Sequence, residues 1–446
     1  MQNFNPFEEK PLPIEKIFMD WDMMYPCPYN KDTTDPYTKC RIVLMNGTEF
    51  EAQWFSRNFA RRCSNDDIQR ELAVTRRSEQ QQQKRISCLK PKNETILEHT
   101  ITYEQLAVDL TAVLAKQETD CNVKNALNFA LLEDFDHLYR YSNLLDYEYS
   151  VCPEKLVGGY TEITPARPTI SEHRYPLDSI FPHINKNASL QTKLNVNIIT
   201  AAEQQTMNYY MNVATLYDRS DLGRRLYQEI GMIEEEHVSQ YESLKDPNCT
   251  WLEELLMHEY IECYLYYSCM QTECDAYIKR IWEQCLLQEI THLHKAKELL
   301  QKYENKDWMQ VIPCGAFPQL LELRPNIEYV REIIRTTTGN TQKLECVVPL
   351  AELPCTDLFY EYQNIVNHNV NSVASHNVIV QRISGRGIDY RFEVAPNPLL
   401  ELQNRRCDNT SLARVDSATP ISAQKCGTAA GCCKCSMSTE GRIVTF

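Results

Sequence analysis

The chain has 446 residues, enough for two or three domains, and its 43% hydrophobic content allows a substantial core. A formal net charge of −15 disfavours nucleic acid and anionic membranes as partners. No apolar run approaches the roughly 18 residues of a membrane span, and the opening residues lack the basic and apolar regions of a secretory signal. The 19 cysteines then fit a reducing compartment better than a disulfide framework, so we expect a cytoplasmic protein.

The first 100 residues predict an irregular region with a small β element. Prolines interrupt residues 1–40. The segment Cys40–Phe55 places Asn46-Gly47 between an apolar β-branched run and an alternating one, a pattern typical of a β-hairpin. The following segment, Ser64–Lys84, predicts a polar helix or a linker.

Two helices are predicted between Thr102 and Tyr147, and they carry a candidate ligand pattern. Glu104 precedes Asp134-x-x-His137 by thirty residues. Two interpretations stay open: a weak copy of the metal-binding pattern described next, or a structural helix pair with an exposed acidic cluster. The segment 148–198 is rich in proline and predicts a long irregular connection.

The strongest pattern lies between Ile199 and Tyr303, where one arrangement occurs twice in segments of helical periodicity. In each copy a lone Glu precedes Glu-x-x-His by about thirty residues, and a Tyr follows the lone Glu after seven. Residues at i and i+3 share a helix face, so each Glu-x-x-His pair can aim two ligands at one point. The copies comprise Glu203, Tyr210, Glu234 and His237, then Glu259, Tyr266, Glu289 and His292.

Hairpin turns would bring the ligands of each copy level. With turns at Asp218–Asp221 and near Thr272–Asp275, the lone Glu and the Glu-x-x-His lie at similar helical depth. A single Glu-x-x-His is usually a solvated helix face, but a carboxylate facing a bundle core needs a partner or a metal. We therefore predict that the two hairpins face each other around one metal centre, where Glu262 adds a carboxylate one turn from Glu259.

These helices resemble the rubrerythrin branch of the ferritin-like superfamily. The resemblance covers about a quarter of the chain and rests on AAEQQTMNYYMNVATLY, IGMIEEEHVSQYESL, LLMHEYIECYLYY and LLQEITHLHKAKELL. A Glu from two helices and Glu-x-x-His from two others is the ligand set of carboxylate-bridged di-iron and di-manganese bundles. The resemblance implies two iron ions, with manganese as an acceptable substitute. Its implied ligands are Glu203, Glu234, His237, Glu259, Glu262, Glu289 and His292.

The function predicted from this resemblance is a di-metal oxidoreductase that acts on peroxide or dioxygen. A rubrerythrin-like peroxidase or oxidase and a catalase-like activity both fit, with an unidentified electron donor and a homo-oligomer as one option for assembly. Tyr210 and Tyr266 are candidates for hydrogen bonds to the ligands or for radical quenching, with core packing as the alternative. Two other functions stay open: an iron-binding or storage protein without turnover, and a structural bundle without metal.

A second arrangement of the hairpins also stays open. The connection Lys245–Cys249 spans at most roughly 20 Å, so the helices it joins must run antiparallel, unlike the long crossover of ferritin-like folds. The segment 148–198 is long enough for such a crossover. In that case the hairpin with Glu104, Asp134 and His137 pairs with 199–243, and 251–303 packs outside.

Beyond Tyr303 the pattern predicts a short helix at Asn326–Arg335 and then strands in LECVVPL, NVIVQRI and DYRFEV. The polar tail is expected to be flexible, and the spacing of its last cysteines, Cys426, Cys432, Cys433 and Cys435, fits no standard metal motif. The predicted fold is mainly α, a ferritin-like helical bundle with an extra helical hairpin and small β-containing N- and C-terminal elements. The predicted domains are 1–100, 101–303 with the insertion 148–198, 304–402 and the Cys-rich tail 403–446.

Overall fold

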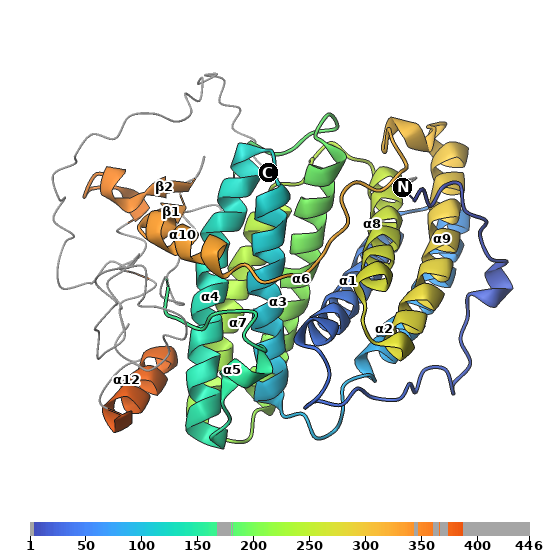
Figure 1. Cartoon of the computed structure of the whole chain (residues 1–446). Coiled ribbons are helices and arrows are strands. Elements are labelled where there is room, and N and C mark those ends of the chain that lie inside the picture. Colours follow the sequence, from blue (N-terminus) through green and yellow to red (C-terminus); the bar gives the residue numbers. More distant parts are fainter. Residues whose placement is uncertain are drawn as a thin grey trace.

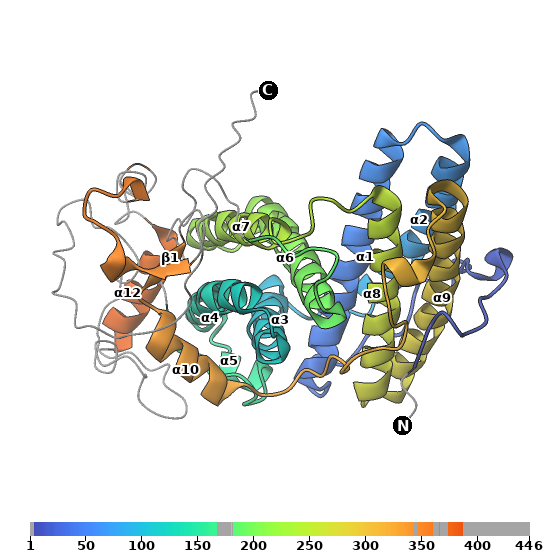
Figure 2. The ribbon, with the colours of Figure 1, turned by 90° about the horizontal axis from the view of Figure 1, so that it is seen from above.

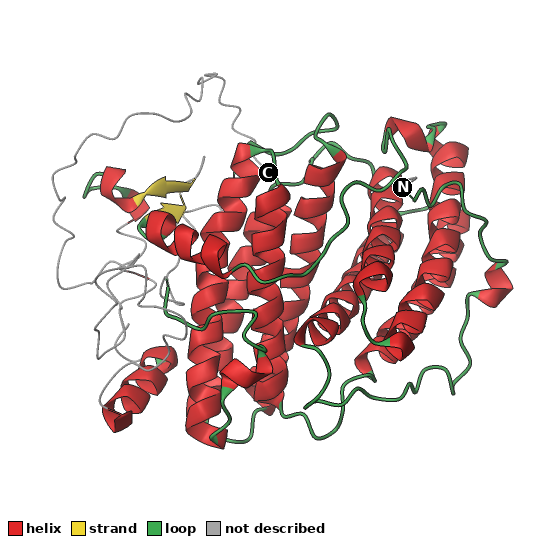
Figure 3. Ribbon diagram, viewed as in Figure 1, coloured by secondary structure: helices red, strands yellow, loops and turns green. Residues whose placement is uncertain are grey.

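Long helices dominate the computed structural model of the chain (Figure 3). The structure describes residues 4–166, 180, 182–342, 347–359, 365 and 373–386. The prediction of a mainly α fold is confirmed. Among the described residues, no helix is both long and apolar enough to cross a bilayer.

Eight long helices form four consecutive hairpins. Each helix begins at a side chain that accepts a hydrogen bond from the first turn, which satisfies backbone donors that the helix leaves free. The capping residues are Asp35, Asn65, Thr95, Asp120, Ser189, Ser220, Thr250 and Asp275. The helices are α1 (Pro36–Arg62), α2 (Asp66–Ser87), α3 (Ile96–Gln117), α4 (Cys121–Tyr149), α6 (Leu190–Leu216), α7 (Asp221–Glu242), α8 (Trp251–Thr272) and α9 (Ala276–Glu304).

The four hairpins assemble into two four-helix bundles that stand side by side (Figures 1 and 2). The central bundle consists of α3, α4, α6 and α7, which are consecutive long helices in the middle of the chain. The flanking bundle consists of α1, α2, α8 and α9, so its two hairpins come from either side of the central bundle in sequence. The central bundle is thus inserted between the two halves of the flanking bundle.

Helix α1 joins the two bundles, because it packs on α2 and α8 as well as on α3 and α6. Its first residues, Tyr37 to Met45, are all buried. At Gly47 a Cβ atom would lie 2.9 Å from the Cβ of Gln205 on α6. The close approach of the two helices therefore requires glycine at this position.

The β-hairpin predicted at Cys40–Phe55 is wrong, since this whole segment lies inside α1. The apolar run has no polar face because α1 is enclosed on most sides, and a helix buried all round loses the 3.6-residue alternation. Asn46-Gly47 marks the contact with α6 and not a turn. The region 1–100 consequently contains a helical hairpin in place of the predicted irregular or β element.

The remaining elements lie around the two bundles. Helix α10 (Ile327–Thr337) packs on α4, and α12 (Ala374–Arg386) packs on α4 and α7. Strands β1 (Asn340–Gln342) and β2 (Val347–Pro349) pair antiparallel. The short segments are α5 (Pro153–Leu156) and the 3-10 turns η1 (Ile14–Lys16), η2 (Trp308–Gln310) and η3 (Leu350–Glu352).

Of the three C-terminal segments predicted as strands, one contains a strand, one is helical and one lies outside the described residues. LECVVPL supplies β2, whereas NVIVQRI is wrong as a strand because it forms most of α12. Val378, Ile379 and Ile383 are buried while Val380 is exposed, which is a helical face against the central bundle. DYRFEV and the tail with its four terminal cysteines lie outside the described residues.

Candidate metal centres

Hairpin geometry brings the predicted ligands level, as their spacing indicates. Helix α6 ends at Leu216 and α7 begins at Asp221, while α8 ends at Thr272 and α9 begins at Ala276. The two turns therefore fall where the sequence predicts them. Each Glu-x-x-His consequently lies beside the lone Glu of its own hairpin.

Six of the acidic and imidazole side chains in the core of the central bundle lie close together, and none of the six is more than 1% exposed. One or two come from each of its four helices. We call them the central cluster: Glu104 on α3, Asp134 and His137 on α4, Glu203 on α6, and Glu234 and His237 on α7.

Glu234 lies between the two imidazoles of the central cluster. Its Oε1 is 2.9 Å from His137 Nδ1, and its Oε2 is 3.2 Å from His237 Nδ1. His237 Nδ1 also lies 3.3 Å from Asp134 Oδ1. Two sets of ligand atoms, each within 4.8 Å of one another, consequently share Glu234: Glu104 with His137 and Glu234, and Asp134 with Glu203, Glu234 and His237.

The electrostatics of the central cluster favour a cation. Burial raises the pKa of Glu203 well above its usual value, and repulsion from Asp134 and Glu234 raises it further. Burial also opposes ionisation of Glu234, but His137 and His237 outweigh it and lower the pKa of this carboxyl to about 2. No donor among the described residues reaches either carboxylate oxygen of Glu203. Buried oxygens without donors fit metal ligation, because such groups are costly unless something satisfies them.

Two side chains outside the cluster orient its members. His237 Nε2 lies 2.9 Å from Glu133 Oε2, so Nδ1 is the ring nitrogen that faces Asp134 and Glu234. A carboxylate on the far ring nitrogen is a common partner of a metal-binding histidine. The Tyr210 hydroxyl donates to Glu104 Oε1. These contacts hold a ligand from α7 and another from α3 in place.

The flanking bundle buries a similar group, the flanking cluster, none of whose members is more than 2% exposed. It consists of Glu49 on α1, Glu79 on α2, Glu259 and Glu262 on α8, and Glu289 and His292 on α9. His292 Nδ1 lies 3.0 Å from Glu289 Oε2 and 3.7 Å from Glu259 Oε2. Two sets of ligand atoms within 4.8 Å share Glu259: Glu79 with Glu259 and His292, and Glu259 with Glu262 and Glu289.

The two clusters share one pattern of positions, but three positions differ: that of His137, that of Asp134, where the flanking cluster has Glu79, and that of Glu262, which has no counterpart in the central cluster. In the flanking bundle Tyr266 donates to Glu49, as Tyr210 donates to Glu104 in the central bundle. Gln82 Nε2 donates to Glu289 Oε1 over 2.5 Å, where His137 Nδ1 meets Glu234 Oε1. Gln82 thus stands in the place of His137.

The sequence therefore contains a fourth copy of the ligand pattern, which sequence analysis missed. Glu49 precedes Glu79-x-x-Gln82 by thirty residues, the interval that also separates Glu104 from Asp134 and Glu259 from Glu289. The signal was present in the spacing. Two features obscure it: Gln82 replaces the histidine, and Glu49 lies in the segment with the β-hairpin pattern.

The structure divides the seven predicted metal ligands between the two bundles. Glu203, Glu234 and His237 lie together with the residues of the α3–α4 hairpin. The remaining four, Glu259, Glu262, Glu289 and His292, lie together with Glu79 of α2. The two hairpins therefore do not enclose one centre, and the alternative pairing of 104–147 with 199–243 describes the central bundle. The connection Lys245–Cys249 joins the two bundles.

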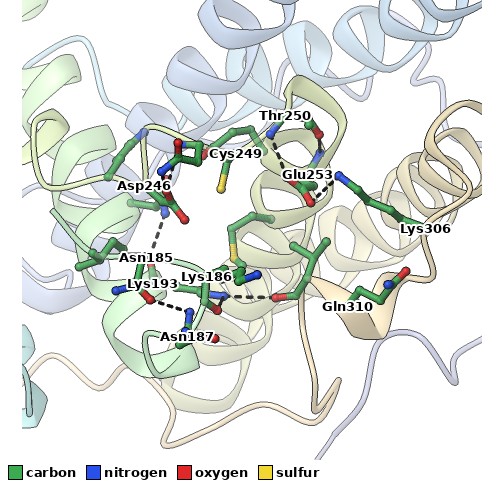
Figure 4. Close-up of a pocket in the computed structure, with 17 residues that line it drawn as sticks. Asn185, Lys186, Asn187, Lys193, Asp246, Cys249, Thr250, Glu253, Lys306 and Gln310 are labelled. Atoms are coloured by element: carbon green, nitrogen blue, oxygen red, sulfur yellow. Dashed lines mark hydrogen bonds and ion pairs between the residues drawn. The ribbon is translucent and has the colours of Figure 1, made fainter.

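A surface pocket of about 560 Å³ lies where this connection meets the first turns of α6 and α8 (Figure 4). Lys306 Nζ reaches Glu253 Oε1 over 2.8 Å at its rim, and Lys193 also lines it. None of the cluster residues is in its lining. The pocket is therefore a feature separate from both candidate metal centres.

Comparison of the chain with protein-family models, with curated proteins and with solved structures finds no match. The functional inference consequently rests on the donor atoms, burial and spacing of the two clusters.

Proposed function

We propose that this protein is a ferritin-like di-metal oxidoreductase acting on peroxide or dioxygen, with two iron ions in the central bundle. The observation that carries the proposal is the donor set of the central cluster. A Glu comes from each of two helices, and a carboxylate-x-x-His pair comes from each of the other two. This is the ligand set of ferritin-like di-iron and di-manganese proteins, with Asp134 in place of one Glu.

The donor atoms divide naturally between two ions. Glu104 and His137 would bind one, and Asp134, Glu203 and His237 would bind the other, with Glu234 near both. Mixed carboxylate and imidazole ligation suits iron, and manganese accepts the same ligands. A bound pair of iron ions supplies two electrons for the reduction of one molecule of oxidant.

The residues of the chain supply orientation and enclosure. Glu133 holds the His237 ring with Nδ1 toward Asp134, and Tyr210 holds Glu104 through a hydrogen bond. All six cluster residues are at most 1% exposed, so bulk water is excluded from the centre. Enclosure of this kind favours a small oxidant such as peroxide or dioxygen over a bulky organic substrate.

Iron loading followed by metal analysis tests the proposal. Wild-type protein loaded anaerobically with Fe(II) should retain two more ions per chain than the Glu234→Gln variant. Glu235→Gln is the matched control, because Glu235 is the next residue of α7 and lies outside the cluster. Equal iron retention in all three proteins would overturn the proposal.

Stopped-flow absorbance with hydrogen peroxide separates the proposed enzyme from its alternatives. Repeated peroxide consumption by the loaded wild type, absent in Glu234→Gln, supports an oxidoreductase. A single oxidation followed by iron retention without turnover indicates an iron-binding or storage protein. A protein that binds no iron is the structural bundle of the third alternative.

A further inference from the structure

We infer that the flanking cluster is a second cation site, built mainly from oxygen donors, for a hard divalent cation such as Mn²⁺. The site lies in a different bundle from the proposed iron centre. The inference therefore goes beyond the oxidoreductase proposal and does not depend on it.

The flanking cluster holds more buried carboxylates than positive groups beside them. The flanking cluster buries five carboxylates with a single imidazole, whereas the central cluster has four carboxylates and two imidazoles. Among the described residues, His292 is the only ion-pair partner within 4.0 Å of any of the five, through Glu259 and Glu289. His258 and Arg76 act on Glu79 only as more distant charges. Carboxylates packed this closely in a dry interior require a cation or protons.

Several carboxylate oxygens of the flanking cluster are buried without a donor from the described residues. Among the described residues, no hydrogen-bond partner reaches either carboxylate oxygen of Glu262 or one oxygen each of Glu49, Glu79 and Glu259. These side chains come from α1, α2 and α8, so they converge from three helices. Since donors normally satisfy buried polar atoms, this convergence indicates a ligand that binds oxygen.

The kind of cation follows from the replacement of histidine by Gln82. This side chain offers no imidazole nitrogen: its Nε2 donates to Glu289 where His137 Nδ1 meets Glu234. Its buried amide oxygen, Oε1, has no hydrogen-bond partner among the described residues. Glu262 adds an oxygen donor that the α6 helix of the central cluster does not supply, and it groups with Glu259 and Glu289. Ligands that are all oxygen suit Mn²⁺, Mg²⁺ and Ca²⁺, whereas imidazole favours iron and zinc. His292 leaves one nitrogen donor in the flanking cluster, which manganese tolerates.

The inference can be tested on the full-length protein by titration with Mn²⁺. The electron paramagnetic resonance signal of the free ion reports how much Mn²⁺ remains unbound. The Glu234→Gln background disables the central cluster, so the remaining bound Mn²⁺ reports the flanking one. Adding Glu262→Gln should weaken this binding by at least about tenfold. Glu254→Gln, two turns earlier on α8 and outside the cluster, should leave it unchanged.

A second variant tests cation preference and removes the ambiguity of a folding defect. Gln82→His restores the imidazole, so Zn²⁺ should displace Mn²⁺ at about tenfold lower concentration than in the parent protein. Mn²⁺ binding that is insensitive to Glu262→Gln, or an unchanged zinc competition in Gln82→His, would overturn the inference. If iron retention still depends on Glu234 in that case, the proposed function stands. If Mn²⁺ binding depends on Glu262 while iron retention does not depend on Glu234, only the proposed function is overturned.

Discussion

The central and flanking bundles share one plan but differ at a few donor positions, of which that of His137 changes the type of donor. Each has a lone Glu on its first and third helices, and a tyrosine from the third helix that holds the Glu of the first. His137 in one bundle corresponds to Gln82 in the other. One framework therefore carries two candidate sites with different donors, because the donor type changes while the helices that hold the donors do not.

The aromatic surroundings sharpen the contrast. In the central bundle the Tyr210 ring lies 5.2 Å from that of Tyr141 and 5.7 Å from that of Tyr227, centroid to centroid. Tyr227 in turn lies 5.3 Å from Tyr217. The Tyr266 ring of the flanking bundle has Trp282 as its neighbour, at 6.1 Å. The central cluster is thus set among redox-active phenols, which fits the bundle proposed to react with an oxidant.

The largest expected effect concerns the junction that makes the two bundles one unit. Asp109 of the central bundle accepts a hydrogen bond from Tyr37 of α1 over 3.0 Å, and it also accepts from Thr161 and Asn326. Burial outweighs these bonds and raises the pKa of Asp109 from 3.8 to about 7. Because the folded state holds the proton more tightly than the unfolded chain, this group makes the protein less stable as pH rises from about 4 to 7.

Asp109→Asn removes that titration. Between pH 4 and pH 7 the wild-type protein should lose up to about 4 kcal/mol more unfolding free energy than the variant, from roughly 1.4 kcal/mol per pKa unit. Urea unfolding at several pH values measures the difference, and other titrating groups cancel between the two proteins. Parallel pH profiles would show that Asp109 is already ionised in the folded protein. Two separate transitions would show that the bundles unfold independently.

The next largest effect comes from exchanging the donor whose type differs between the clusters. His137→Gln gives the central cluster the amide of the flanking one, and Gln82→His does the reverse. Since imidazole favours iron and zinc, the first variant should lose about 10- to 100-fold in Zn²⁺ affinity relative to Mn²⁺ at the central cluster. Gln82→His should shift the flanking cluster in the opposite direction. Calorimetric titration of both apoproteins checks this, and shifts of equal sign would contradict the comparison.

Much of the fold followed from local sequence patterns. Helical periodicity and turn residues located the α6–α7 and α8–α9 hairpins, and the thirty-residue intervals set the depth of Glu203 and Glu234 correctly. Sequence spacing, however, sets the depth of a ligand along its own helical hairpin. It does not set which other hairpin packs against that one. The pairing of α6–α7 with α3–α4 depends on contacts between residues far apart in the chain. Glu49 is hard to recognise in the sequence because the buried helix α1 has no polar face. The Glu79-x-x-Gln82 pair is hard to recognise because an amide replaces the histidine.

A smaller effect is expected where α1 crosses α6 between the bundles. In Gly47→Ala the new Cβ meets the Cβ of Gln205 at 2.9 Å, and neither atom can move without its backbone. Overpacking costs about 1–3 kcal/mol, and the gain in helix propensity offsets about 1 kcal/mol. A net loss of roughly 1 kcal/mol should appear in thermal unfolding. Gly385→Ala in α12, where no atom of the described residues lies within 4 Å of the added Cβ, is the control and should not destabilise the protein.

The smallest effect on stability comes from the paired tyrosines, and it separates hydrogen bonding from core packing. Tyr210→Phe and Tyr266→Phe keep the buried ring and remove only the hydroxyl that holds Glu104 or Glu49. Each should cost about 1 kcal/mol of unfolding free energy, the usual net value of a hydrogen bond. If iron chemistry belongs to the central bundle, Tyr210→Phe alone should change the rate at which peroxide oxidises the iron-loaded protein. Equal rate changes in both variants would place oxidant chemistry in both bundles, and unchanged stability would make the two hydroxyls dispensable and leave the rings a packing role.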